Sequence, residues 1–237
     1  MKFKRIFAIL IGIKLAIAGA IAAYAFLVRP WHLRWGANDE EVDLELPGDD
    51  LIESPKLQAT HAIDIQASPA EVWPWLVQLG QGRGGFYSYD WIENSMGLDI
   101  HTTDQIIPEY QKLEPGDVIP LAPDGFGVPV AILEPEKALV LHGDTREDGP
   151  GEAPVMKEGD FMAVSWGFYL FDAPDGATRL VERFRADWNE APHNTLFYRV
   201  FLEPGSFVME RKMLLGIKER AEAHSKPENI ALHSIEK

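Results

Sequence analysis

Glu182 and His142 are the residues of this 237-residue chain best suited to acid–base chemistry. Glu182 lies in residues 178–186, whose alternating pattern predicts a strand, and it shares one face there with Leu180 and Phe184. If this face is apolar and enclosed, the carboxyl group holds its proton more tightly and can exchange it near neutral pH. The alternative is a carboxylate at a rim or surface that pairs with a neighbouring arginine. With Glu182 facing inward, the arginines of the strand are expected to face solvent: Arg179, Arg183 and Arg185.

His142 closes a second apolar segment, Ala138–His142, directly before a Gly-Asp pair. It is a candidate general base, and the alternative is a histidine satisfied at the end of a strand. Together with Glu182 it could serve a cyclase, dehydrase or isomerase in which Tyr87 or Tyr89 hydrogen-bonds a developing enolate. This hypothesis requires Glu182 and His142 to open into one pocket.

The segment Trp73–Trp91 combines aromatic residues with glycines, a composition unusual for both an exposed loop and a core helix. We expect aromatic residues from its second half to line a cavity, together with a tryptophan of the predicted strand 161–171. These candidate ligand-binding residues are Tyr87, Tyr89, Trp91 and Trp166. They offer apolar surface with hydroxyl and indole N–H groups, and the alternative is an ordinary aromatic core. Asp90 is a candidate polar contact, although exposure on a helix is the simpler expectation.

The glycines of this segment, Gly80–Gly85, match the G-x-G-x-x-G spacing of dinucleotide-binding loops. They follow a predicted helix rather than a strand, so we interpret them as a turn between two helices. The chain has no cysteine, and its seven histidines lack the spacing of zinc motifs, so a metal site would need long-range assembly. We therefore expect no cofactor and no metal. The absence of a G-x-S-x-G motif also argues against nucleophilic hydrolysis.

Several patterns predict the elements that position these residues. Residues 61–66 alternate as a strand, and a helix then begins at Ser68, where Glu71 can complete a capping box, and ends at Gly80. A second helix is predicted over Tyr87–Met96. The following apolar segments, separated by turns, predict an antiparallel meander: 128–133, 138–142, 161–171 and 178–187.

The C-terminal part predicts a long amphipathic helix, interrupted at residues 204–205 and starting again with Ser206 as its cap. An antiparallel sheet curved around this helix accounts for the order of elements and leaves a cavity between the two. The sequence Ser-Pro-Ala-Glu-Val-Trp at 68–73, the aromatic residues 86–91 and the closing helix together resemble the SRPBCC superfamily. These START-like, helix-grip proteins include polyketide cyclases/dehydrases and lipid-transfer domains, and the chain looks most like a membrane-anchored bacterial branch.

The resemblance spans roughly residues 30–223 and implies an α+β helix-grip fold, with two short helices after the first strand. It implies no particular activity, because this fold hosts carriers, receptors, cyclases and oxygenase subunits, and no catalytic motif of the family can be matched here residue by residue.

Residues 6–28 form an apolar run broken only by Lys14, long enough as a helix to cross a hydrocarbon core of about 30 Å. We interpret it as an uncleaved membrane anchor, and the alternative is a cleaved signal peptide. Basic residues on both sides favour a cytoplasmic N-terminus, with the soluble domain on the extracytoplasmic side. The predicted organisation is an anchor, a connector, a helix-grip domain and a C-terminal tail, over 1–29, 30–58, 59–224 and 225–237.

Residues 36–237 carry 16 basic and 37 acidic side chains, a formal charge of −21 that disfavours nucleic acid as a partner. The leading hypothesis is a membrane-tethered domain that binds a hydrophobic or aromatic small molecule, such as a lipid or a polyketide-like compound, in an internal cavity. The alternatives are the acid–base enzyme described above and a non-catalytic envelope module that binds another protein.

Overall fold

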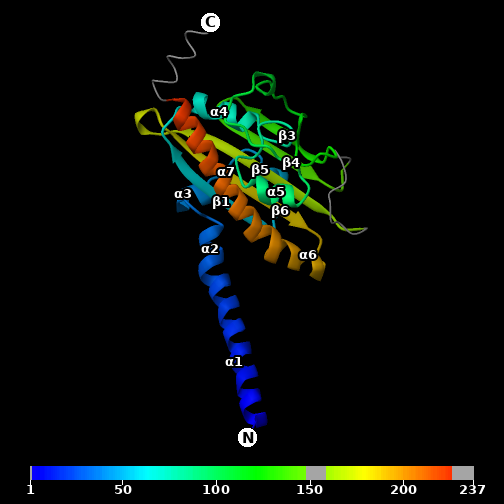
Figure 1. The fold of residues 1–237 in the computed structure, drawn as a ribbon. Coiled ribbons are helices and arrows are strands. Elements are labelled where there is room, and N and C mark those ends of the chain that lie inside the picture. Colours follow the sequence, from blue (N-terminus) through cyan, green and yellow to red (C-terminus); the bar gives the residue numbers. More distant parts are fainter. Residues whose placement is uncertain (1, 148–158, 226–237) are drawn as a thin grey trace.

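The computed structural model describes residues 2–147 and 159–225. Within these residues, six antiparallel strands form one sheet, and a long C-terminal helix crosses one of its faces (Figure 1). The strand order is β1-β6-β5-β4-β3-β2, so the first and last strands of the chain lie side by side. This is the α+β, helix-grip arrangement that the resemblance implies.

The elements have the following bounds. The N-terminal helical elements are α1 Lys2–Ala23, η1 Tyr24–Val28, α2 Arg29–His32, α3 Asp39–Asp43 and η2 Asp49–Leu51. The strands are β1 Leu57–Ile65, β2 Val118–Pro120, β3 Gly127–Glu134, β4 Ala138–Asp144, β5 Met162–Asp172 and β6 Thr178–Trp188. Helical turns between the strands are α4 Pro69–Val77, α5 Asp90–Ser95, η3 Pro108–Tyr110 and η4 Pro174–Gly176. The C-terminal elements are α6 Pro192–Leu196, η5 Phe197–Leu202 and α7 Glu203–His224.

The predicted strands are confirmed, because each of the four apolar segments of the meander overlaps one of β3 to β6. The capping box is also confirmed, since the backbone N–H of Ser68 donates to Glu71 Oε2 at 2.8 Å. The first helix ends at Val77, earlier than predicted. The second is shorter than 87–96 because Tyr87 has a left-handed φ of 55° and cannot belong to it.

The sheet has an inner face toward α7 and an outer face, and both are covered. On the inner face, Leu139, Phe168 and Leu180 belong to the main apolar core together with Leu214 and Ile217 of α7. On the outer face, a smaller cluster joins the strands to residue 46 of the segment that precedes β1: Leu46, Ala138, Val140, Tyr169 and Val181. The segment predicted as a connector is therefore packed onto the sheet.

Burial of the β6 arginines corrects the expectation that they face solvent. Arg183 and Arg185 are buried on the outer face, and both lie within 2.7 Å of the Asp49 carboxylate. Arg179 remains partly exposed and pairs with Glu41 at 2.7 Å. The predicted alternation of the strand is confirmed, but residues 36–52 cover its outer face.

The C-terminal helix also differs from the prediction, because helical turns run without interruption from Pro192 to His224. The turn ahead of Pro204 is a π-helix, Phe197–Leu202, and this wider turn accommodates a proline that lacks an N–H. Ser206 is not a cap: its hydroxyl donates to the carbonyl of Glu203 at 3.2 Å, inside the helix.

The N-terminal helix projects away from the sheet (Figure 1). Among the described residues, one helix, Ile11–His32, is long and apolar enough to cross a membrane, with a mean hydropathy of 2.1. A signal sequence near the N-terminus passes the same test of length and composition. Of the predicted C-terminal tail, residues 226–237 lie outside the described part of the chain.

Candidate functional site

A cluster of three buried titratable side chains joins the sheet to the helix. β1 and β6 are paired so that His61 lies directly opposite Glu182, and both side chains point to the inner face. Glu210 of α7 approaches the same imidazole. His61 Nδ1 is 2.7 Å from Glu182 Oε2 and 3.5 Å from Glu210 Oε2. The three residues are 1%, 0% and 7% exposed, so water does not screen these charges.

Two further contacts fix the cluster. His61 Nε2 is 2.9 Å from the carbonyl oxygen of His32, and Trp166 Nε1 donates to Glu182 Oε1 at 2.7 Å. Because both ring nitrogens of His61 face acceptors, each carries a proton and the ring is an imidazolium. Glu182 is its carboxylate partner and also accepts from the indole.

Electrostatics agree with this assignment of protons. Burial alone would lower the pKa of His61, but the charge and hydrogen bond of Glu182 together raise it to about 9. Burial, and then the negative charge of Glu182, raise the pKa of Glu210 to about 8. At neutral pH the cluster therefore holds an imidazolium, a carboxylate and a neutral carboxylic acid, and its net charge is zero.

The same three side chains are the described residues that could hold a metal ion, since one donor atom of each lies within 4.8 Å of the others. One nitrogen and two carboxylate oxygens suit a divalent cation. The donors His61 Nδ1 and Glu182 Oε2 are, however, at hydrogen-bonding distance. Two ligands bonded to one cation at about 2.1 Å stand roughly 3 Å or more apart. The short distance between His61 Nδ1 and Glu182 Oε2 therefore fits a hydrogen bond between them better than joint coordination of a metal ion.

A second ionic cluster lies where the N-terminal helix meets the start of α7. Glu203, whose side chain is 1% exposed, accepts from Arg29 at 2.7 Å and from Arg199 at 2.8 Å. Phe207, one turn along α7, packs against the rings of Trp31 and His61, with centroids 5.4 and 5.5 Å apart. The candidate membrane span is thereby tied to the same region of the domain as the first cluster.

The structure separates the two residues predicted for acid–base chemistry. Glu182 is fully buried on the inner face, as the alternation predicts, so its alternative as a rim residue is wrong. His142 pairs with Ser165, whereas Glu182 pairs with Phe168, three positions along the same strand. Because side chains alternate between faces, His142 points to the outer face. Its Nδ1 is 2.9 Å from the carbonyl oxygen of Val164, the satisfied strand-end arrangement. The two cannot act together on one substrate.

The predicted aromatic wall is only partly assembled. Trp166 is half-buried on the inner face, 6.5 Å from the ring of Phe86 between centroids. Tyr89 is half-buried at the start of α5. Trp91 is 72% exposed on α5, and Tyr87 is 1% exposed, within the core. Of the four candidates, Trp166 is the one in contact with the buried cluster.

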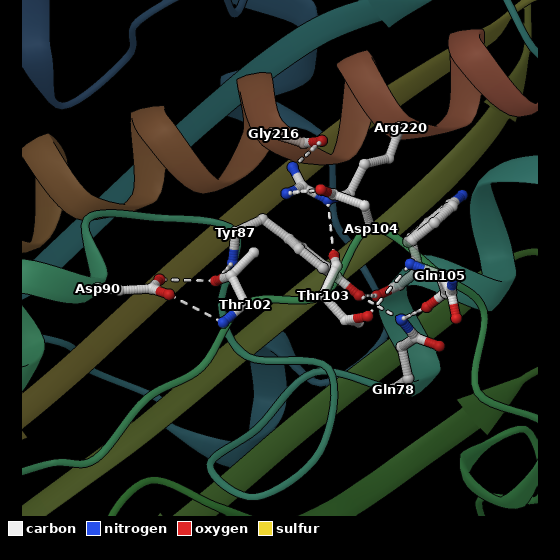
Figure 2. A network of polar contacts seen from close by, with 10 residues as sticks. Gln78, Tyr87, Asp90, Thr102, Thr103, Asp104, Gln105, Gly216 and Arg220 are labelled. Atoms are coloured by element: carbon white, nitrogen blue, oxygen red, sulfur yellow. Dashed lines mark hydrogen bonds and ion pairs between the residues drawn. The ribbon is translucent and has the colours of Figure 1, made fainter.

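Tyr87 belongs to a polar network that holds the loop after α5 against α4 and α7 (Figure 2). Its buried centre around Tyr87 and Gln78 is neutral, and an ion pair between Arg220 and Asp104, at 2.6 Å, lies at its exposed edge. The Tyr87 hydroxyl donates to the carbonyl of Trp75 at 3.1 Å and accepts from Gln78 Nε2 at 2.9 Å. Arg220 donates from α7 to the carbonyl of Thr103 at 2.9 Å. Burial raises the pKa of Tyr87, which keeps the hydroxyl protonated. This network is a structural brace.

Asp90 contributes to the same brace. It accepts from the backbone N–H and the hydroxyl of Thr102, at 2.8 and 2.7 Å, and is half-buried rather than exposed (Figure 2). The glycine segment forms the predicted turn between two helices, closed by a backbone bridge between Gly80 and Gly85.

Sequence reasoning missed His61 and Glu210, although both carried a signal. His61 shares the alternation of Ile63 and Ile65, which places it on the apolar face of β1. Glu210 follows Phe207 by three residues and precedes the buried Leu214 by four, so it lies on the core stripe of the helix.

A groove of about 740 Å³ opens at the end of the domain where α6 follows the sheet. It is lined by Lys56, Trp188, Glu190, Ala191, Pro192, Thr195, Leu196, Arg199 and Val200. Its wall is mostly apolar, with the two cations already paired: Lys56 with Asp187 and Arg199 with Glu203.

No family model matches the chain, and no curated protein sequence matches it either. Among solved structures, a hypothetical protein from Helicobacter pylori aligns at a TM-score of 0.43 and 10% identity, over 75% of this chain and 95% of its own. The Aha1 dimer from Colwellia psychrerythraea aligns at 0.40 and 18%, over 72% and 99%. A Mesorhizobium loti protein aligns at 0.40 and 14%, over 71% and 100%. None of these similarities bears on function.

Proposed function

We propose that this protein is a membrane-tethered helix-grip domain that binds a hydrophobic or aromatic small molecule between the inner face of its sheet and α7. One observation carries the proposal. Four neighbouring side chains of β5 and β6 lie on the inner face and are only partly buried, although three of them also touch the cluster around Trp188 and Tyr198: Met162, Val164, Trp166 and Phe184. We call them the inner strip. An apolar strip on a core face that the helix leaves partly uncovered is a surface for an apolar ligand.

The polar side chains beside the inner strip define what a ligand meets there. The indole N–H of Trp166 is taken by Glu182, so its ring offers apolar surface and no free donor. Glu210 is a neutral acid at neutral pH, because burial raises its pKa to about 8. It can donate a hydrogen bond to a carbonyl or hydroxyl oxygen at the polar end of a mostly apolar molecule.

The tether rests on the apolar helix Ile11–His32 and on the charges around it. Basic residues precede and follow the apolar run of the sequence, and the acidic body lies beyond it. We place the N-terminus in the cytoplasm and the domain on the extracytoplasmic side, where a lipid or a lipid-soluble compound can reach the inner strip from the bilayer.

Native mass spectrometry of the full chain, released gently from membranes, tests the proposal. We expect a co-purifying small molecule in the wild-type protein. Val164→Trp, which fills the inner strip, should reduce it several-fold, whereas Phe171→Trp, on the outer face of the same strand, should keep it. Absence of any bound molecule, together with no thermal shift across a panel of fatty acids, phospholipids and fused-ring aromatics, contradicts the proposal. If both variants retain the co-purifying molecule equally, the ligand does not bind at the inner strip.

A further inference from the structure

Apolar side chains are exposed along one side of the C-terminal helical run, at its N-terminal end. The first four recur at spacings of three and four residues, and the fifth follows seven residues later, as on one face of a helix. They are Leu196, Phe197, Val200, Phe201 and Val208, exposed by 58%, 37%, 52%, 64% and 48%. We call them the foot stripe. A water-facing helix ordinarily carries polar residues at such positions, so this surface needs a partner.

The opposite side of the same helical turns is already packed on the domain. Tyr198 is buried and stacks on Trp188 with ring centroids 4.3 Å apart, and Leu202 packs against the same cluster. The helical run is therefore apolar on both sides here. Packing within the domain accounts for one side and leaves the foot stripe unexplained.

The foot stripe adjoins the end of the candidate membrane span. Arg29, at the end of that span, and Arg199, within the stripe's own helical turns, both pair with Glu203. Trp31, which is 55% exposed, meets Phe207 edge to face. Figure 1 shows α2 and α6 at the same end of the domain, the end from which α1 departs. The exposed apolar surface thus continues from the span onto the domain.

Charge at this end differs from charge on the rest of the body. Residues 36–237 carry a formal −21, yet four arginines gather around the junction, Arg29, Arg34, Arg199 and Arg211. They outnumber their acidic partners, since Arg29 and Arg199 share Glu203 and Arg34 pairs with Asp39. Arg211 lies over the ring of Trp35, 4.9 Å from its centroid. Basic and tryptophan side chains beside an apolar face are the composition of a helix that lies in the headgroup region of a bilayer.

We propose that the foot stripe is inserted in the interfacial region of the same bilayer leaflet in which the membrane span ends. The inference rests on the proposed membrane tether and extends it: the domain lies on the membrane at a fixed orientation instead of hanging from a flexible stalk. The groove beside α6 shares Leu196 and Val200 with the foot stripe, so its mouth opens at the level of the lipid headgroups.

The cysteine-free chain allows single labels to test this directly. Full-length Phe26→Cys, Phe201→Cys and Glu219→Cys proteins would each carry an environment-sensitive fluorophore in nanodiscs of phosphatidylcholine and phosphatidylglycerol. Phe26 reports the span, Phe201 the foot stripe, and Glu219 an exposed site near the far end of α7. Spin-labelled lipids then quench any fluorophore that lies in the bilayer.

We expect strong quenching and a blue-shifted emission at positions 26 and 201, and an aqueous signal at 219. An aqueous signal at 201 with a lipid signal at 26 overturns the inference and leaves the tether standing, and it makes a protein partner the occupant of the foot stripe. An aqueous signal at both positions overturns the tether as well. Val208→Cys repeats the measurement about two helical turns away if the label at 201 disturbs the fold, which thermal melting reports.

Discussion

Two polar networks meet α7 at different points along the helix, one at Glu210 and one at Arg220, and their buried parts differ in charge. The His61–Glu182–Glu210 cluster holds an ion pair and a neutral acid between the sheet and α7. At the buried centre of the network around Tyr87, neutral groups and backbone carbonyls are joined, and its charged members, Asp90 and the Arg220–Asp104 pair, lie toward the partly exposed edge (Figure 2). The conspicuous aromatic segment supplies the neutral brace, and the charged cluster beside the inner strip comes from residues far apart in the sequence.

The difference has a physical consequence. A neutral hydrogen bond can be lost at the cost of one unsatisfied group, whereas a buried ion pair cannot lose one partner without leaving a bare charge in a low dielectric. The charged cluster should therefore be the more sensitive to substitution and to pH, and the brace should respond to neither as strongly.

Removal of the carboxylate at the centre of the charged cluster should have the largest effect. Glu182→Ala leaves the His61 imidazolium and the Trp166 N–H without their partner, and should lower the free energy of unfolding by about 3–5 kcal/mol. Urea denaturation of the full chain in detergent measures it, with the exposed Glu134→Ala as the matched control. A loss no larger than that of the control would show that the cluster is not a buried ion pair.

Stability should also fall as the pH rises, through the same cluster. The folded-state pKa of His61, about 9, exceeds its ordinary 6.5, and that of Glu210, about 8, exceeds its ordinary 4.5. The folded state therefore holds protons that the unfolded state releases. The His61 contribution is complete below about pH 6.5 and lost as the pH rises through about 9, and the Glu210 contribution is lost between about 4.5 and 8.

Thermal melting between pH 6 and 9 checks this, with an expected loss of about 6 kcal/mol when the two groups titrate independently. Glu210→Gln keeps a neutral group in place and should make the profile shallower, leaving the His61 part, whereas Glu219→Gln, exposed on the same helix, should leave the slope unchanged. A wild-type profile that rises with pH over this range would contradict the assignment of protons.

The neutral brace should tolerate the loss of one hydrogen bond better. Tyr87→Phe removes a hydroxyl that contacts Gln78 and the carbonyl of Trp75, and should cost about 1–2 kcal/mol with no change in pH dependence. Tyr110→Phe, which removes an exposed hydroxyl bonded to the carbonyl of Gly82, should cost less. A loss as large as that of Glu182→Ala would erase the contrast between the two networks.

The smallest effect is expected at the tryptophan that the sequence placed in the cavity wall. Trp91 is 72% exposed on α5, so Trp91→Ala should change stability by no more than about 0.5 kcal/mol and leave ligand binding unchanged. Denaturation and the thermal shift with fatty acids or fused-ring aromatics report the two quantities. A marked loss of ligand binding would show that α5 belongs to the binding site.

Alternation along single elements could be read from the sequence, and relations between elements could not. The pattern of Leu180, Glu182 and Phe184 was sufficient to place Glu182 on the inner face. The separation of His142 from Glu182 depends on the register of β4 against β5, which no pattern within either strand reveals. The same holds for the burial of Arg183, which depends on how residues 36–52 fold back over the sheet.

The direction in which Tyr87 points is determined by its own backbone conformation, yet the sequence did not predict it. Tyr87 takes a left-handed backbone conformation, which aims its ring into the core instead of along a helix toward the sheet. A non-glycine residue in this conformation is uncommon, and the surrounding hydrogen bonds hold it there. Composition predicted that aromatic residues of this segment turn toward the sheet, and among them the neighbouring Phe86 is the one whose ring meets Trp166.

Methyl NMR of methionine most directly tests the claim that the inner strip is the binding surface. Met162 lies in the inner strip, and Met96, 64% exposed at the end of α5, is an internal control in the same spectrum. On addition of oleate or a naphthol to the full-length protein in nanodiscs, we predict a shift of the Met162 resonance and none of Met96. An unchanged Met162 resonance under conditions where the ligand raises the melting temperature would contradict the assignment of the site.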